Sequence, residues 1–361
     1  MHRRSFLAAA AAATIAIAGL QGASLANDTM KLTGPFAHEN LAVYFIHGTS
    51  ASGAVPLTLQ EALAKGTAHV YETGTVSELT VENTGDEAVF IQAGDIVKGG
   101  RQDRVLTFSL LLAAKSGKVP IASFCVEQGR WSARGREDVA RFASSAETLP
   151  SREAKLALKR AASGASSADA PPQQRTSALM PDITTGATAR IEQRQLQARS
   201  SRDGQSEIWS RVAETQRKLS DSVASAVASP QSATSLQLTL EHQKVQEARA
   251  AYAAALKAKG ETGDDILGVV VAINGRLNSA EVYPSNGLFR KMWGKLLSSA
   301  ATEAVSERAA PNGPAPAASL AKEFLAEAET GKQAERSIAA MVKLQCQRHF
   351  EPDPGLSWSP T

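Results

Sequence analysis

The feature that most constrains the fold is a run of eight apolar residues, 266–273, followed directly by Asn274-Gly275. An Asn-Gly pair between two β-type segments is the strongest short-range signal for a two-residue hairpin turn. Residues 276–283 are therefore predicted to return as the partner strand. A strand this apolar is not stable in an isolated two-stranded ribbon, so it must lie inside a larger sheet that the rest of the chain helps to build.

The first part of the chain is rich in strand signals. Thr58 and Glu61 have the spacing of a capping box, which predicts a short helix that ends at Gly66. Apolar runs separated by turn residues occur at 41–46, 68–72, 76–83, 88–92, 105–113 and 119–126. Residues 27–143 are therefore predicted to form the β-rich half of the domain.

Composition changes between residues 144 and 206, which are rich in Ser, Ala, Gln and Arg, contain Pro171-Pro172 and have no Phe, Tyr or Trp. Such a stretch buries too little apolar area to offset the entropy lost on ordering. It is predicted to be a disordered, low-complexity insertion. The alternative is a long helical hairpin, because residues 152–162 have a helical pattern.

The α/β half is predicted at residues 207–350, followed by a tail at 351–361. Helices are expected near 208–227 and 240–257, and Ser285 is expected to cap another helix after the 266–283 hairpin. The 266–273 strand must share a sheet with others, so we expect one α+β domain. Its β-rich core has mostly antiparallel strands and hairpins, packed by several helices.

The N-terminus has the features of an export signal. Arg3-Arg4 precede Phe6-Leu7, an apolar stretch follows, and small residues stand at 24 and 26. This pattern resembles the twin-arginine consensus. The stretch is too short and too alanine-rich to span a bilayer. We therefore expect cleavage after about Ala26 and a periplasmic or secreted mature protein with no membrane attachment.

Charge and cysteine content exclude several classes of protein. The chain has 39 basic and 36 acidic residues, and removal of the signal takes away two arginines, which leaves a net charge of +1. A nearly neutral chain argues against nucleic-acid binding. Cys125 and Cys346 are too few for a disulfide scaffold. One disulfide remains an alternative, but Cys125 lies in an apolar run and is predicted to be a buried thiol.

The histidines do not indicate a metal site, because no pair has metal-ligand spacing. His47 ends a predicted strand and is interpreted as a loop or core residue rather than a base. No nucleophile elbow, P-loop or dinucleotide fingerprint is present. Ser/His/Asp and Cys/His catalysis therefore have no sequence support, and the residues do not identify a cofactor.

Polar residues converge at the end of one predicted hairpin. If Ser116-Gly117 is its two-residue turn, Leu106 lies opposite Glu127 and Asp103 lies opposite Arg130. The apolar character is lost at the same level on both strands. This register gathers Gln102, Asp103, Arg104, Glu127, Arg130 and Trp131 at one corner.

This corner is the predicted ligand site. Arg104 and Arg130, with Gln102 beside them, suit a carboxylate or phosphate, and Trp131 suits a planar ring or a sugar. Paired glycines, here Gly99-Gly100, allow the backbone to approach a ligand closely. Catalytic roles fall to three acids: Glu127 as a general base or metal ligand, and Asp95 or Glu72 as its assistant. The alternative is an ion-pair network that closes the end of a sheet.

The corner also carries a family resemblance. The segments Gly94-Asp95-Ile96-Val97-Lys98-Gly99-Gly100-Arg101-Gln102-Asp103-Arg104 and Cys125-Val126-Glu127-Gln128-Gly129-Arg130-Trp131 resemble the ARPP family, named for association with ADP-ribosylglycohydrolases and the rhodanese-phosphatase superfamily. Residues 58–63 and 268–304 also resemble it, although Glu281-Val282-Tyr283 stands where members show an acidic residue and a phenylalanine. The resemblance implies a link with ADP-ribose or NAD-related enzymes and no established reaction.

Three functions follow from these observations. The first is an exported binding domain for a small anionic molecule, nucleotide-like or ADP-ribose-like. The second is a hydrolase that uses Glu127 with Asp95 or Glu72 at the same corner. The third is a non-catalytic structural or interaction protein, which binds a protein partner through its helices or the 144–206 segment.

Overall fold

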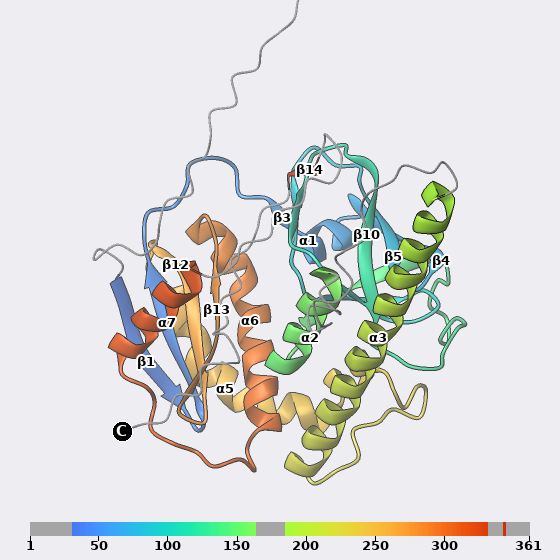
Figure 1. The fold of residues 1–361 in the computed structure, drawn as a ribbon. Coiled ribbons are helices and arrows are strands. Elements are labelled where there is room, and N and C mark those ends of the chain that lie inside the picture. Colours follow the sequence, from blue (N-terminus) through green and yellow to red (C-terminus); the bar gives the residue numbers. More distant parts are fainter. Residues whose placement is uncertain (1–30, 164–184, 331–341, 344–361) are drawn as a thin grey trace, which may run out of the picture.

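The computed structural model describes residues 31–163, 185–330 and 342–343, and these form two β structures joined by helices (Figure 1). The predicted signal peptide, the tail and Cys346 lie outside the described residues. Within them, no helix is both long enough and apolar enough to cross a bilayer.

A four-stranded antiparallel sheet contains the predicted hairpin. Its order is β1 (Lys31–His38), β2 (Leu41–His47), β12 (Ile266–Ile273) and β13 (Arg276–Val282). Asn274 and Gly275 have φ of 52° and 74°, as a type I′ turn requires. The hairpin prediction is therefore confirmed, and β12 is buried along its whole length because strands and helices surround it.

Helices cover both faces of this sheet. On one face, α5 (Gln243–Glu261) and α6 (Asn286–Ser306) enclose Phe45, which packs edge-on against Trp293. On the other face, α7 (Ala318–Thr330) packs against Tyr44 and Ile46. Ser285 caps α6 by accepting a hydrogen bond from the Leu288 amide, as its sequence position predicts.

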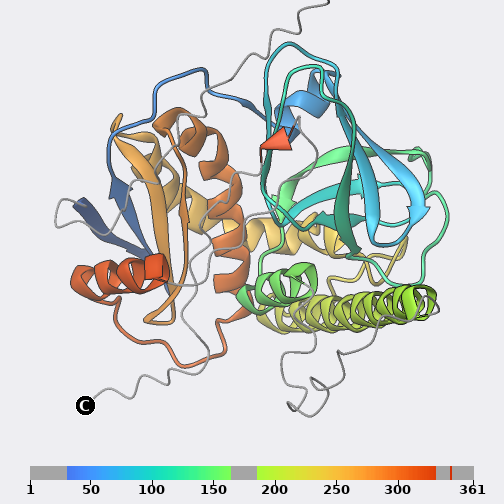
Figure 2. The same cartoon turned by 45° about the horizontal axis from the view of Figure 1, so that its top comes forward.

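The second β structure is a closed six-stranded barrel (Figure 2). Its strands, in barrel order, are β10 (Gly117–Cys125), β5 (Glu78–Asn83), β4 (Ala68–Thr75), β11 (Arg141–Thr148), β7 (Asp95–Gly99) and β8 (Arg104–Leu106). A smaller sheet, in the order β14 (Val342–Lys343), β9 (Leu110–Leu112), β6 (Val89–Ile91) and β3 (Leu57–Thr58), adjoins the barrel. Within the described strands only β3 and β6 pair in parallel. The expected α+β class is confirmed.

Short-range signals near the barrel are also confirmed. Helix α1 (Leu59–Ala64) begins at Thr58, whose hydroxyl accepts from the Glu61 amide while the Glu61 carboxylate accepts from the Thr58 amide. The two β structures do not correspond to the two halves of the sequence, however. Strands β1 and β2 leave the N-terminal half and pair with β12, because only a full sheet buries that strand on both sides.

The predicted disorder of residues 144–206 is wrong wherever this segment is described. Residues 144–148 complete β11, followed by α2 (Arg152–Ser163), and α3 (Thr185–Ser222) begins before the segment ends. Helices α2 and α3 lie side by side along the barrel (Figure 2). Gly204 is so close to Ala161 that an added Cβ would lie 2.6 Å from the alanine Cβ. Small side chains thus let α2 and α3 pack closely although residues 144–206 contain no aromatic residue, and the helices agree with the helical alternative. Residues 164–184, including Pro171-Pro172, are outside the described part.

The predicted hairpin at Ser116-Gly117 is wrong in its register. Leu106 pairs with Ser123 rather than with Glu127, and β9 pairs with β6 instead of β10. The cause is Asn83, whose side chain donates to the Ala113 carbonyl and whose own carbonyl accepts from the Ser116 amide. These bonds hold the turn against β5, so β9 and β10 separate.

A buried carboxyl group of α6 links the start of α2, beside the barrel, to β13 of the four-stranded sheet. Glu303 of α6 accepts hydrogen bonds from the Arg152 amide at the start of α2, at 2.8 Å, and from the Asn278 side chain of β13, at 3.1 Å. Its side chain is buried, and burial raises the pKa of Glu303 to about 7. The ionised form is therefore disfavoured at this junction.

Glu303→Gln should change how stability depends on pH. Because the folded pKa lies above the unfolded value of about 4.5, the folded state binds more protons between pH 4.5 and 7, and the free energy of unfolding falls as pH rises through that window. The shift corresponds to about 3 kcal/mol. Urea titrations at pH 5 and pH 8 should show that E303Q loses this part of the pH dependence. The exposed control Glu323→Gln should keep it, and an unchanged slope in E303Q would contradict the assignment.

Candidate functional site: an ion-pair network at the barrel end

The polar corner forms at the barrel end where β7 and β10 stop and β8 begins. The Asp103 amide donates to the Glu127 carboxylate at 3.0 Å, and the Gln102 side chain donates to the Glu127 carbonyl at 3.0 Å. The Val126 amide donates to the Asp103 carbonyl at 3.0 Å. The corner therefore assembles through backbone pairing continued beyond Cys125–Arg104, despite the wrong register prediction.

Arg130 is fully engaged within the protein. Its Nε and Nη2 contact the two oxygens of Glu127, each at 2.7 Å. Its Nη1 donates to the carbonyls of Gly100 and Ser132, and its Nη2 also donates to that of Gly99. These acceptors match the five N–H donors of a guanidinium group. Arg130 therefore has no donor left for a ligand unless an internal bond breaks.

Arg134 is the central residue that sequence reasoning missed. Its Nη1 and Nη2 donate to the two oxygens of Asp103 at 2.9 and 3.1 Å, and its Nε and Nη2 donate to Glu137. The hydroxyl of Ser235, the N-cap of α4 (Leu236–Leu240), donates to the same Asp103 carboxylate at 2.8 Å. No local pattern could reveal this contact, because its members lie far apart in the chain.

Glu127 is held as a paired carboxylate. Its side chain has no exposed surface. Burial tends to raise the pKa of Glu127, but hydrogen bonds from Arg130, Ser232 and the Asp103 amide lower it below its usual range. A group that is ionised, buried and bonded on both oxygens does not reach a water molecule in the way a general base must.

A second ion pair lies beneath Trp131. Glu72 accepts from the Arg101 amide at 3.2 Å and from Nη2 of Arg104 at 3.4 Å. Arg104 is completely buried, its Nη1 donates to the Gln102 carbonyl, and its Nε has no partner among the described residues. Trp131 covers it, with the guanidinium carbons of Arg101 and Arg104 at 5.3 and 5.6 Å from the ring centroid. Trp131 itself is 43% exposed.

Asp95 does not join the corner. It begins β7, whereas Gly99 at the corner ends that strand, which separates them by about 13 Å at the usual rise per residue. Asp95 is buried and forms an ion pair with Lys295 of α6 at 2.8 Å. The structure therefore brings Glu72 to the corner, but it places Asp95 at the junction with α6.

The glycine pair has a packing role. Gly99 and Gly100 have φ of 114° and 54°, and a Cβ on Gly100 would lie 2.2 Å from the Phe142 ring. Their carbonyls accept from Arg130, so both face the network rather than open space. The glycines are needed for this turn and for the close approach of Phe142.

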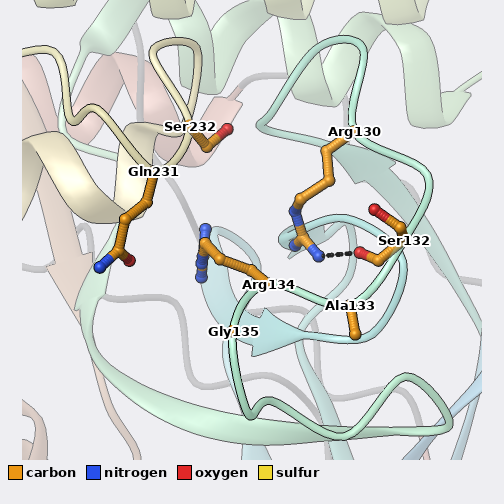
Figure 3. Close-up of a pocket in the computed structure, with 7 residues that line it drawn as sticks. All are labelled: Arg130, Ser132, Ala133, Arg134, Gly135, Gln231 and Ser232. Atoms are coloured by element: carbon orange, nitrogen blue, oxygen red, sulfur yellow. Dashed lines mark hydrogen bonds between the residues drawn. The ribbon is translucent and has the colours of Figure 1, made fainter.

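A hollow of about 410 Å³ adjoins the network (Figure 3). The hollow lies between the loop at 130–135, which carries Arg130 and Arg134, and the loop that carries Gln231 and Ser232. It is lined by Arg130, Ser132, Ala133, Arg134, Gly135, Gln231 and Ser232. No group of three or more His, Cys, Asp or Glu side chains in the described ranges is arranged to hold a metal ion.

Cys125 lies next to this network and is completely buried. Burial raises the pKa of its thiol to about 11, which keeps it protonated and unreactive at neutral pH. The expectation of a buried thiol at this position is confirmed, whereas pairing with Cys346 falls outside the described residues.

The fold and the site define an α+β protein whose six-stranded barrel is closed at one end by buried ion pairs. Residues 29–353 match the family described as the ARG and Rhodanese-Phosphatase-superfamily-associated Protein domain, ARPP-1. This match covers most of the chain, so the chain belongs to that family. No curated protein and no solved structure matches it.

Arg134→Ala should destabilise the protein strongly, because it leaves Asp103 buried without its main cationic partner. Breaking a buried pair in this way costs about 3–5 kcal/mol. Chemical denaturation followed by tryptophan fluorescence measures the effect. The matched control is Arg136→Ala in the same loop, which removes an exposed arginine and should change stability by about 0.5 kcal/mol or less. Similar losses in both variants would argue against the network.

Proposed function

We propose that this chain is exported and that its barrel corner binds a small anionic molecule with a planar ring, nucleotide-like or ADP-ribose-like. The observation that carries the proposal is Trp131, a large aromatic side chain that is 43% exposed although it stands on a rigid network of buried charges. An exposed aromatic held in a fixed position offers a stacking surface at little entropic cost.

Two arginines next to Trp131 have the donors that the ligand needs. The Arg101 guanidinium lies 5.3 Å from the centroid of the Trp131 ring and has no ion pair in the described part of the chain. The buried Arg104 lies beneath the same ring, and its Nε has no hydrogen-bond partner among the residues that the structure describes. A ring stacked on Trp131 with its phosphate or carboxylate at Arg101 would use both features, and movement of Trp131 would expose Arg104.

This assignment differs from the one expected from the sequence. Arg130 was expected to hold the anion, but its donors are all engaged with Glu127 and carbonyl oxygens. We therefore assign Arg130 to the support of the loop and transfer its ligand role to Arg101. The hollow beside Arg130 and Arg134 would receive the part of the ligand that extends past the ring.

The two alternatives have less support. A hydrolase at this corner would need Glu127 to contact water, whereas its carboxylate is buried and paired, and Asp95 lies at the other end of β7. A purely structural protein would account for the buried network, but it gives no reason for an exposed Trp131 next to two arginines.

A thermal-shift screen tests the proposal. The panel contains ADP-ribose, adenine nucleotides, sugar phosphates, simple carboxylates and divalent metals. Ligand at 100 times its Kd adds about 2.7 kcal/mol to the free energy of unfolding. A ring-bearing anion should raise the melting temperature, and Trp131→Ala should weaken its binding about 5- to 150-fold, as expected for a lost stacking contact.

Arg101→Ala should weaken binding of the same ligand. The charge-matched control is Arg136→Ala, which removes an exposed arginine and should leave the affinity unchanged. Isothermal titration calorimetry measures both affinities. Equal losses in R101A and R136A would indicate a general charge effect instead of a site. A panel in which nothing shifts the melting temperature would favour the interaction-protein alternative.

A further inference from the structure

A second hollow, of about 350 Å³, lies at the edge of the four-stranded sheet, away from the barrel corner. Its lining includes apolar side chains together with hydroxyl, imidazole and ammonium groups. The residues are Thr33, Phe36, Phe45, His47, Lys259, Thr262, Gly263 and Ile266. The function proposed above makes no use of this place.

Three residues in and beside this hollow form a hydrogen-bonded chain. Thr33 Oγ1 lies 2.8 Å from Nε2 of His47, and Nδ1 of His47 lies 2.9 Å from Oδ1 of Asp265. The chain runs from a hydroxyl through an imidazole to a carboxylate, in the order used by hydroxyl nucleophiles in acyl transfer.

The sheet register brings these residues together. Thr33 on β1 pairs with Phe45 on β2, so His47, two residues further along β2, is its diagonal neighbour on the same face. Across the other edge of β2, His47 pairs with Ile266, and Asp265 immediately precedes that residue. Three segments that are distant in sequence thus meet at the end of β2.

The hydrogen bonds select one tautomer of the neutral imidazole. Because a carboxylate can only accept, Nδ1 of neutral His47 carries the proton toward Asp265, and Nε2 then accepts from the Thr33 hydroxyl. The bond from His47 lowers the pKa of Asp265, which keeps this carboxyl ionised. The imidazole is therefore oriented to remove the proton from Thr33.

We propose that Thr33, His47 and Asp265 form a second, hydrolytic site that cleaves carboxylic esters with a small apolar acyl group. Thr33 is the nucleophile and His47 the general base and acid. Asp265, which contacts His47 rather than the substrate, is a positioning residue. This inference is independent of the proposed ligand site at Trp131.

The lining of the hollow indicates the substrate class. Phe36, Phe45 and Ile266 provide an apolar wall for the acyl chain. Lys259 lines the same hollow, with its Nζ 5.6 Å from the centroid of the Phe36 ring and no ion pair in the described part of the chain. Its charge is available to stabilise the oxyanion that forms when the carbonyl is attacked.

The reaction needs no cofactor. The Thr33 oxygen bonds to the ester carbonyl carbon while its proton passes to Nε2 of His47. The tetrahedral intermediate then releases the alcohol, which takes that proton, and an acyl-Thr33 ester remains. Water attacks this ester, gives a proton to His47 and releases the carboxylic acid, and the proton returns to the Thr33 oxygen.

Turnover and covalent labelling test the proposal on the purified protein. p-Nitrophenyl acetate and butyrate serve as substrates, and a fluorophosphonate serves as the label, whose attachment is located by peptide mass spectrometry. We expect label on Thr33. Thr33→Val, which keeps the shape but removes the hydroxyl, should lower kcat/KM at least 100-fold and abolish labelling. Thr33→Ser should retain both, because it keeps the nucleophile.

The control is Thr80→Val on β5 of the barrel, a half-buried threonine far from the hollow in the fold, which should leave the esterase rate unchanged. Melting temperatures establish that each variant is folded. Absence of turnover and of Thr33 labelling in the wild-type protein would overturn the proposal, and so would equal rates in folded T33V and wild type.

His47→Gln should lower kcat at least 100-fold. The positioning role of Asp265 is tested by a pair of variants, because its side chain is 56% exposed and could be replaced without loss of packing. Asp265→Asn should reduce kcat with little change in KM, and Asp265→Glu should restore much of the rate. If D265N and D265E were equally slow, or both as fast as wild type, Asp265 would have no role in orienting His47.

Discussion

The buried pairing of Asp103 with Arg134 is the interaction on which the barrel end depends. Both side chains are almost fully removed from solvent, and an ion in that position is tolerated only when its partners satisfy it. The pair connects the turn after β7, the loop after β10 and the start of α4 through Ser235. Arg130 and Glu127 extend the same network to Gly99 and Gly100, so one set of bonds determines the shape of the whole corner.

This network separates support from recognition. Arg130 and Arg134 donate their hydrogen bonds to groups inside the protein, and Glu127 is paired with them. These three charged residues are therefore the least available to a ligand. The groups that remain available to contact a ligand are Trp131, Arg101 and, beneath the ring, Arg104. A rigid charged base beneath an exposed aromatic ring is a suitable arrangement for a binding surface, since the ring is held without help from the ligand.

Local signals were predictable from the sequence, and distant contacts were not. The Asn274-Gly275 turn, the Thr58 capping box and the Ser285 cap each depend on a few adjacent residues, and all were found. The meeting of Arg134 with Ser235, and of Thr33 with His47 and Asp265, depends on tertiary structure. The helical pair α2–α3 was underestimated because its packing uses close contact between small residues such as Gly204 and Ala161, which hydropathy does not detect.

The pairing of β2 with β12 has a consequence for how the chain reaches this structure. Strand β2 is made near the start of the chain, but its partner arrives only after more than 200 further residues. During synthesis, β2 therefore presents an apolar, unpaired edge for a long interval, and such edges associate readily with other strands. Contacts of this sequence separation also close slowly. The four-stranded sheet thus cannot close until β12 has been made, and the nascent chain needs protection until then.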